Sequence, residues 1–400
     1  MSNLKQLYFK HLAQTSPSSL ALEIEDANGV FLYSPDGKNY IDLIAGVSVA
    51  NLGHKNQRII KAIEIQANRY LHLMVYGEII QAPQVLLAEK LSDFLPNSLS
   101  SVFFVNSGSE AIETAMKLAK RITGRSEIIA CRNAYHGSTQ GALSLQSHAY
   151  FTGSFRPLLP GIKHINFNSF SDLENISKNT SCVIIEPIQG EAGVILPKNG
   201  YLDSLKERCL KTGTLLIFDE IQTGFGRTGD LFAFQKYKIT PDILVLAKAL
   251  GGGLPLGAVI SSKENMDYFT DNPILGHITT FGGHPLSCAA ALESLNILTE
   301  SNNIIDSVKK KADLFVNLLH PFKLFKEIRY DGLLMAIDLG NPKTFFNFLP
   351  YLYKNGIHTD WFLFNEQSFR ISPPLTISED EIREASDRII NAVKKFENNE

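Results

Sequence analysis

The sequence predicts an α/β protein whose larger part is a three-layer domain built on a mostly parallel sheet. Short runs of Val, Ile and Leu recur in the middle of the chain, and amphipathic stretches separate several of them. Continuous apolar runs of this length indicate strands that are buried on both faces, as in a parallel sheet covered by helices. The expected strands are Val102–Val105, Ile128–Cys131, Cys182–Ile185, Thr214–Phe218 and Ile243–Leu246, and the expected helices include Glu110–Arg121 and Leu202–Lys211.

Three regions follow from the distribution of these patterns. Residues 1–53 predict an N-terminal arm with short strands, because two turn signals, at 27–29 and 35–37, separate its apolar runs. We expect residues 54–285 to form the large domain. Residues 286–400 predict a smaller α+β domain, against which we expect the arm to pack. Its expected elements are a helix after Pro285 and the stretches Ile304–Leu319, Leu333–Leu339, Thr344–Lys354 and Glu379–Phe396.

Composition narrows the class of protein. The chain has 400 residues, 44% of them hydrophobic, and a formal net charge of -3, so it has no basic field that would attract nucleic acid. No apolar run approaches the roughly 20 residues of a membrane span, and the first residues lack the apolar core of a signal peptide. The four cysteines form no CxxC pair and have no histidine at zinc-ligand spacing. We expect a soluble cytoplasmic protein without a bound metal, a nucleic-acid partner or a membrane partner.

The first candidate for chemistry is Asp219, which directly follows the apolar run Thr214–Phe218. Ligands of open α/β sheets bind at the carboxyl ends of the strands. A carboxylate there can hold a cationic ring nitrogen and keep it protonated, because the opposite charge raises the pKa of that nitrogen. Taken alone, an acid at the end of a strand is better explained as a side chain that caps the following turn than as a ligand-binding group.

The second candidate is Lys248, which closes the run Ile243–Leu246 and precedes three glycines, Gly251 to Gly253. Glycines allow backbone and ligand to approach closely, and a partly desolvated lysine loses its proton more readily. Such a lysine can act as a nucleophile toward an aldehyde. The separation from Asp219 is 248 − 219 = 29 residues, enough for a crossover and a strand, so both side chains can end neighbouring strands.

The third candidate is the segment Ser107-Gly108-Ser109, which follows a strand and opens a helix. Two hydroxyl groups, a glycine and the free N–H groups of a helix start together form an anion site. A plain serine cap is the simpler interpretation of this segment alone. The sequence has no Walker A loop and no GxGxxG after a strand, so the expected anion is a single phosphate rather than a nucleotide.

Together, the phosphate cradle, the acid for a ring nitrogen and the aldehyde-binding lysine specify pyridoxal 5′-phosphate (PLP). From about Gly37 to Leu375 the sequence resembles the class III aminotransferases, the group that acts on ornithine, acetylornithine and 4-aminobutyrate. The motifs that carry the resemblance are Asn106-Ser-Gly-Ser-Glu-Ala, Tyr135-His-Gly, Glu186-Pro-Ile-Gln-Gly-Glu, Asp219-Glu-Ile-Gln-Thr-Gly-Phe-Gly-Arg-Thr-Gly, Lys248, Thr279-Thr-Phe-Gly-Gly and Arg370-Ile-Ser-Pro-Pro-Leu.

The resemblance implies the PLP-dependent transferase fold type I and a homodimer whose two active sites are shared. It implies that Lys248 forms the Schiff base with PLP, that Asp219 holds the pyridine nitrogen and that Tyr135 stacks on the ring. The other implied cofactor contacts are Ser107, Gly108 and Ser109 at the phosphate, Gln222 at the ring hydroxyl, and Thr280 at the phosphate of the partner subunit. By the same resemblance His54 and His136 are structural.

The resemblance further implies that Glu191, Arg370 and Thr279 concern the substrate. An arginine suits a carboxylate because its fork is bidentate. In similar enzymes the glutamate pairs with the arginine while an ω-amine reacts, and withdraws when 2-oxoglutarate brings its own α-carboxylate. The family often has an arginine three residues after the ring-stacking aromatic, where this chain has Ser138. That departure puts acetylornithine in doubt as the donor.

The expected reaction is therefore a ping-pong transamination from an ω-amino donor to 2-oxoglutarate, with Lys248 as the proton shuttle. The main alternative is an aminomutase or racemase of the same fold that uses no external acceptor. A non-catalytic binding protein that keeps the fold is a second alternative, and the presence of the lysine, the acid and the phosphate cradle argues against it.

Overall fold

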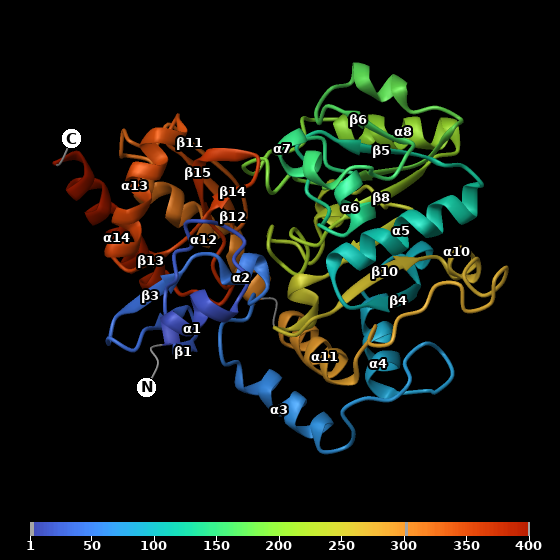
Figure 1. Ribbon diagram of the computed structural model, residues 1–400, viewed down its shortest axis with the longest axis horizontal. Helices are drawn as coiled ribbons and strands as arrows, with labels where there is room; N and C mark the ends of the chain where they lie inside the picture. Colours follow the sequence, from blue (N-terminus) through green and yellow to red (C-terminus); the bar gives the residue numbers. More distant parts are fainter. Residues whose placement is uncertain (1–3, 301–302, 399–400) are drawn as a thin grey trace.

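A seven-stranded sheet forms the centre of the larger part of the molecule (Figure 1). The computed structural model describes residues 4–300 and 303–398. The strand order is β4-β10-β9-β8-β7-β5-β6. The bounds are β4 (Ser101–Val105), β5 (Glu127–Cys131), β6 (Ile162–Ile165), β7 (Thr180–Ile185), β8 (Leu215–Asp219), β9 (Ile243–Leu246) and β10 (Gly257–Ser261).

The sheet is parallel from β9 to β6, whereas β10 runs antiparallel to both of its neighbours, β9 and β4. Residues 247–256 join β9 to β10, which is too short for the helical crossover that a parallel connection needs. The expected mostly parallel sheet is thus confirmed. Strands β6 and β10 were not expected, since β6 carries Lys163 and His164 and lacks a continuous apolar run.

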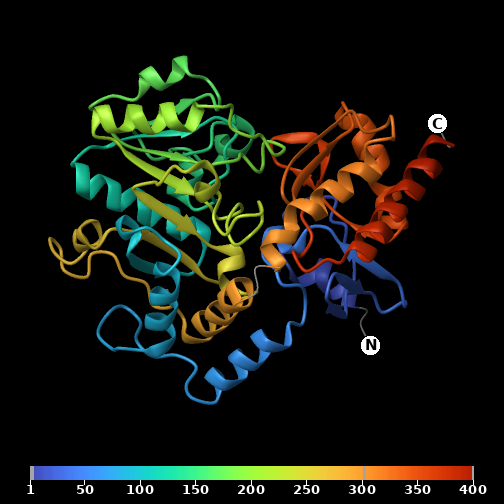
Figure 2. The ribbon, with the colours of Figure 1, turned by 180° about the vertical axis from the view of Figure 1, so that it is seen from behind.

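Both faces of the sheet are buried, as the apolar runs predicted. In β7, Cys182 and Ile184 belong to one hydrophobic cluster, while Val183 and Ile185 belong to another. The first cluster includes the buried face of α5 (Gly108–Thr123), and the second includes residues of α8 (Tyr201–Thr212) and α11 (Pro285–Glu300). Figures 1 and 2 show these helices on opposite sides of the strands, which makes three layers.

Helix α5 positions the candidate phosphate cradle, and its ends are defined by local sequence. The Oγ of Ser107 accepts a hydrogen bond from the backbone N–H of Glu110 at 3.2 Å, which caps the first turn. Gly124 ends the helix with a φ of 66°, a left-handed conformation that favours glycine. The remaining helices of this part are α3 (Gln57–Ala67), α4 (Ala82–Ser92), α6 (Gln140–Ser144), α7 (Ala149–Thr152), α9 (Ala233–Tyr237) and α10 (Lys263–Asp267).

The C-terminal part has its own four-stranded antiparallel sheet, in the order β11-β12-β15-β14. Its strands are β11 (Glu327–Asp331), β12 (Leu334–Asp338), β14 (Trp361–Phe362) and β15 (Asn365–Ile371), and its helices are α12 (Asn303–Leu319), α13 (Pro342–Lys354) and α14 (Glu379–Glu397). These elements lie beside the large sheet in both views (Figures 1 and 2). Strand β15 matters for the site because it carries Arg370.

The N-terminal segment lies against this C-terminal part. Its elements are α1 (Leu4–His11), β1 (Asp26–Asn28), β2 (Phe31–Tyr33), β3 (Asn39–Asp42) and α2 (Ala45–Ser48). Strands β1, β2 and β3 belong to one small sheet. Strand β3 pairs in parallel with β13 (Ile357–His358), so the fourth strand of this sheet comes from the C-terminal part of the chain. The predicted boundaries between the three regions, at residues 53 and 285, stay a prediction.

None of the helices within residues 4–300 and 303–398 has the length and hydropathy that crossing a bilayer requires. The four cysteines are all buried and free.

Candidate active site

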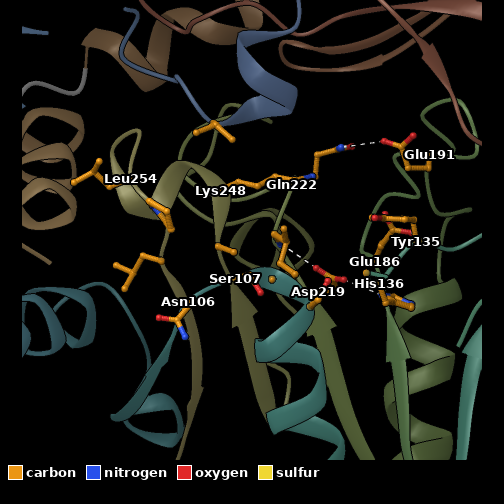
Figure 3. Close-up of a pocket in the computed structure, with 18 of the residues that line it drawn as sticks. Asn106, Ser107, Tyr135, His136, Glu186, Glu191, Asp219, Gln222, Lys248 and Leu254 are labelled. Carbon is orange, nitrogen blue, oxygen red and sulfur yellow. Dashed lines mark hydrogen bonds and ion pairs between the residues drawn. The ribbon is translucent and has the colours of Figure 1, made fainter. Parts of the chain in front are cut away.

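The carboxyl ends of the central parallel strands open on a cavity of about 470 Å³ (Figure 3). This is where ligands bind in open α/β sheets. Nine of the lining residues carry the argument below: Ser107, Gly108, Ser109, Tyr135, Glu186, Glu191, Asp219, Gln222 and Lys248. They come from five different connections after strands, so the fold alone brings them together.

Asp219 is the last residue of β8 and is buried at the floor of the cavity. Its Oδ1 accepts a hydrogen bond from the backbone N–H of Ile221 at 3.0 Å, and its Oδ2 lies 2.8 Å from Nδ1 of His136. The expectation that His136 is structural stays a prediction, and the structure adds that this buried ring lines the cavity and holds the acid. The sequence signal was its place beside Tyr135 in the Tyr-His-Gly motif.

Lys248 lies two residues beyond β9, which pairs in parallel with β8. The expected adjacency to the end of β8 is thus confirmed. Burial lowers the pKa of the Lys248 amine, although the negative charge of Glu191 opposes this shift. The backbone of Lys248 has a φ of 51°, a left-handed conformation that is strained for a side chain of this size. Strain of this kind concentrates at functional sites.

The start of α5 faces the cavity with the N–H groups of Gly108 and Ser109, which have no acceptor within the helix. The loop after β5 packs directly on this turn. A Cβ atom at Gly137 would lie 2.2 Å from Oγ of Ser109, so only glycine fits there. The backbone N–H of Ser138 donates to the same Oγ at 3.2 Å.

Tyr135 and Gln222 line the wall between the cavity floor and the ion pair described next. Burial raises the pKa of the Tyr135 hydroxyl, and a hydrogen bond with Ser138 works against that shift. The side-chain amide of Gln222 lies 3.3 Å from Nζ of Lys248 and 3.1 Å from Nη1 of Arg370, where an amide oxygen accepts from both cations.

The ion pair joins Glu191 and Arg370 at 2.8 Å between Oε1 and Nη2. The arginine side chain is 1% exposed and the glutamate side chain 9%. Burial alone would raise the pKa of Glu191, but the charges of Arg370 and Lys248 outweigh burial and hold that pKa below its usual value. The glutamate is therefore ionised and lies between the cavity and the arginine.

Glu186 is a further carboxyl group of the cavity that we did not expect from the sequence, although its motif was noted. It follows β7, and its Oε1 accepts from the backbone N–H of Gly190 at 3.2 Å. Burial and the nearby charge of Asp219 raise the pKa of Glu186 well above its usual value. Burial and the neighbouring carboxylate thus both favour the neutral form of Glu186.

Thr279 and Thr280 are not among the residues that line this cavity. The Oγ1 of Thr279 accepts a hydrogen bond from Nδ2 of Asn106 at 2.9 Å, and Thr280 is exposed. The two threonines are therefore not brought together with Glu191 and Arg370 within one chain.

The residues present fit PLP. A buried acid for the ring nitrogen, a lysine of lowered pKa and a helix start with free N–H groups surround one cavity of suitable size. Among the residues that the structure describes, no group of three or more His, Cys, Asp or Glu side chains could hold a metal ion.

Comparisons with known proteins agree with this geometry. The sequence pattern of the class-III aminotransferases matches residues 13–393. The structure is similar to an ornithine aminotransferase from Toxoplasma gondii, with 30% identity, a TM-score of 0.91, and 99% of this chain and 96% of that chain covered. It is also similar to an omega transaminase from Pseudomonas jessenii in complex with PMP, with 29% identity, a TM-score of 0.89, and 99% and 98% covered.

A third similar structure is an amine transaminase from an uncultivated Pseudomonas species in its PLP-bound form. The identity is 26% and the TM-score 0.87, with 96% of this chain and 98% of that chain covered.

Proposed function

Since this chain belongs to the class-III aminotransferases and is a PLP-dependent transaminase, we propose that it moves an amino group from an ω-amino donor to 2-oxoglutarate. The reaction is ping-pong, with the donor half-reaction first and the acceptor half-reaction second. The donor belongs to the class of ornithine, acetylornithine and 4-aminobutyrate.

The observation that carries this proposal is the buried pair of Glu191 and Arg370 at the wall of the cavity. A fixed arginine in a dry site is suited to the α-carboxylate of a keto acid, but it would be a costly unpaired charge while a simple amine reacts. Glu191 removes that cost when no carboxylate is present. The pair thereby supports two alternating substrates in one site.

PLP supplies an electron sink when it is bound. Lys248 would hold the cofactor covalently through Nζ, and as a free amine its Nζ would take a proton from the substrate carbon and deliver it to the cofactor. The lowered pKa of Lys248 suits this task, because a larger share of the amine is neutral at a given pH. Asp219, held by His136, would keep a proton on the ring nitrogen. Ser107, Gly108 and Ser109 would hold the phosphate, and Tyr135 would lie against the ring.

We further propose a homodimer in which Thr280 reaches the phosphate of the partner subunit. Exposed apolar side chains lie in the segments around residues 71–86 and 274–281, and Ile80 is 93% exposed. Both segments line a second, apolar groove that also contains Thr279. Exposed apolar surface of this kind marks a protein contact, and Thr280 lies within it.

If the active site is shared between subunits, mixing two inactive variants should restore activity. Chains with Lys248→Ala and chains with Thr280→Glu are each expected to be inactive, the second because a carboxylate would face the phosphate. In a mixed dimer one site has both lesions and the other has neither, so about half of the sites in mixed dimers should be active, which is about a quarter of all sites after random pairing of equal amounts of the two chains. The measurement is transaminase activity after unfolding and refolding the two chains together.

The matched control for this experiment mixes Lys248→Ala with Asp219→Asn. Both residues act in the site of their own chain, so every mixed site keeps one lesion and no activity should return. Proven mixed dimers of the first pair without activity would contradict a shared site.

The carboxylate role of Arg370 predicts unequal losses in the two half-reactions. Loss of a buried charge pair costs about 2–5 kcal/mol. Arg370→Ala should therefore slow the 2-oxoglutarate half-reaction by about 30-fold or more, whereas an amine without a carboxylate should lose far less. Single-turnover kinetics measure the two half-reactions separately. An equal loss for both substrates would contradict the alternating role of Glu191.

The general test of the proposal is a donor screen with 2-oxoglutarate as acceptor and ornithine, acetylornithine, 4-aminobutyrate and lysine as donors. Ser138 replaces the arginine that similar enzymes often carry, so acetylornithine should be a poor donor. Transfer of isotopic nitrogen from the donor to 2-oxoglutarate distinguishes transamination from an aminomutase or racemase, which would transfer none.

A further inference from the structure

A second carboxylate, that of Asp360, holds Arg370 at a different nitrogen from Glu191. The Oδ1 of Asp360 accepts from Nε of Arg370 at 3.0 Å, and the Asp360 side chain is 30% exposed. The backbone ties the same two residues together, because the N–H of Arg370 donates to the carbonyl of Asp360 at 3.0 Å. The Oγ1 of Thr359 donates to the carbonyl of Arg370 at 2.6 Å. Asp360 is thus fixed relative to the strand that carries the arginine.

The segment from Thr359 to Phe364 contacts both members of the ion pair. The ring of Phe362 lies under the guanidinium group, 4.5 Å from its central carbon. The backbone N–H of Leu363 donates to Oε2 of Glu191 at 3.1 Å, and that of Phe364 donates to the Glu191 carbonyl at 3.0 Å. One short segment therefore sets the position of the arginine and of the glutamate that covers it.

The arrangement of donors decides which edge of the guanidinium group a substrate can use. Nε is occupied by Asp360, Nη2 by Glu191, and Nη1 lies beside the amide of Gln222. When Glu191 withdraws, Nη2 becomes free while Nε stays bound, and Nη1 has a second N–H group besides the one that faces the amide of Gln222. An edge of two parallel N–H groups is the bidentate partner that a carboxylate requires.

We propose that Asp360 is a positioning residue that keeps the Nη1–Nη2 edge of Arg370 directed at the cavity while Glu191 and the substrate carboxylate exchange. The inference rests on the proposed function, in which Arg370 binds the α-carboxylate of 2-oxoglutarate. Without Asp360 the guanidinium group keeps the Phe362 face, the neutral amide of Gln222 and the departing glutamate, so its one remaining charged partner is the group that moves.

Charge and position predict opposite effects here, which makes the role of Asp360 testable. The titratable groups near it are Arg370, Glu191 and His358. A second negative charge next to Arg370 should by itself repel an incoming carboxylate, so its loss would strengthen binding of 2-oxoglutarate. A positioning hydrogen bond has the reverse effect, since its loss weakens binding.

The experiment follows the reaction of the aminated holoenzyme with 2-oxoglutarate in single turnovers. Hydrogen bonds to charged groups contribute about 1.5–3 kcal/mol, so Asp360→Ala should raise the 2-oxoglutarate concentration at half-maximal rate by about tenfold or more. The limiting rate should change much less. Asp360→Asn keeps an oxygen that can accept from Nε, and it should bind 2-oxoglutarate as tightly as the unchanged enzyme or more tightly. An amine donor without a carboxylate should react normally with both variants.

Asp338→Ala is the matched control, because it removes another carboxylate that is paired with an arginine in the same sheet, with 3.0 Å between Asp338 and Arg329. It should leave the 2-oxoglutarate dependence unchanged. If Asp360→Ala does not fold, Asp360→Ser replaces it, since serine is too short to reach Nε.

Unchanged or tighter binding of 2-oxoglutarate in Asp360→Ala would overturn the inference, and so would equal weakening in the alanine and asparagine variants. The variant Arg370→Ala tests the proposed function independently of the role of Asp360. A normal 2-oxoglutarate reaction in that variant refutes the proposed function itself. A severe loss there, together with a normal Asp360→Ala, refutes only the positioning role.

Discussion

Exchanging Lys248 for alanine should leave a folded protein that binds PLP without a covalent bond and transaminates at least about 1,000-fold more slowly. The variant loses two contributions at once, the covalent attachment of the cofactor and the base that moves the proton. No other lysine lines the cavity to replace them among the residues that the structure describes. The measurement is the rate of each half-reaction together with the visible absorbance of the purified protein.

Two controls separate chemistry from folding. Lys263→Ala removes a lysine whose side chain is 73% exposed and does not line the cavity, so it should leave activity unchanged. Lys248→Arg keeps a positive charge but cannot act as a base at neutral pH, so it should be nearly as inactive as alanine. Reduction of the unchanged holoenzyme with borohydride should fix the cofactor on Lys248, and a label on any other lysine would contradict the assignment.

The positions of Asp219 and Lys248 could be predicted from the sequence because both depend on local rules. Each follows a continuous apolar run, such runs indicate parallel strands, and the carboxyl ends of parallel strands meet at one edge. The pairing of β8 with β9 confirms this arrangement. The start of α5 could be predicted for a similar reason, since Ser107 caps the helix by a contact only three residues away.

Other parts of the site could not be predicted, because they depend on contacts between distant segments. His136 reaches Asp219 over 83 positions, and although its place beside Tyr135 indicates that it lies near the site, that motif does not indicate a contact with the acid. The same holds for Asp360, because its proposed role depends on the contact of its segment with Arg370 in β15. Strand β10 was overlooked because five apolar or small residues after a glycine-rich turn fit a loop equally well.

Changing Asp219 to asparagine should leave PLP bound but slow proton abstraction by about 100-fold or more. The ring nitrogen would lose its anionic partner, and an ion pair at about 3 Å is worth on the order of 5 kcal/mol at an effective dielectric constant of about 20. Part of that stabilisation is used only as negative charge develops at the reacting carbon, so the rate should fall more than cofactor binding does. Asparagine has nearly the same shape and can still accept from the backbone of Ile221.

Asp42→Asn is a closely matched control for this prediction. Asp42 is also buried, lies 2.8 Å from a histidine, His54, and accepts backbone hydrogen bonds, from Ile44 and Ala45 at 3.0 Å. It does not line the cavity. The same substitution there should change the free energy of unfolding without slowing the amine half-reaction. Near-normal single-turnover rates in Asp219→Asn would refute its role, whereas equal slowing in both variants would show that loss of any buried Asp–His pair is enough.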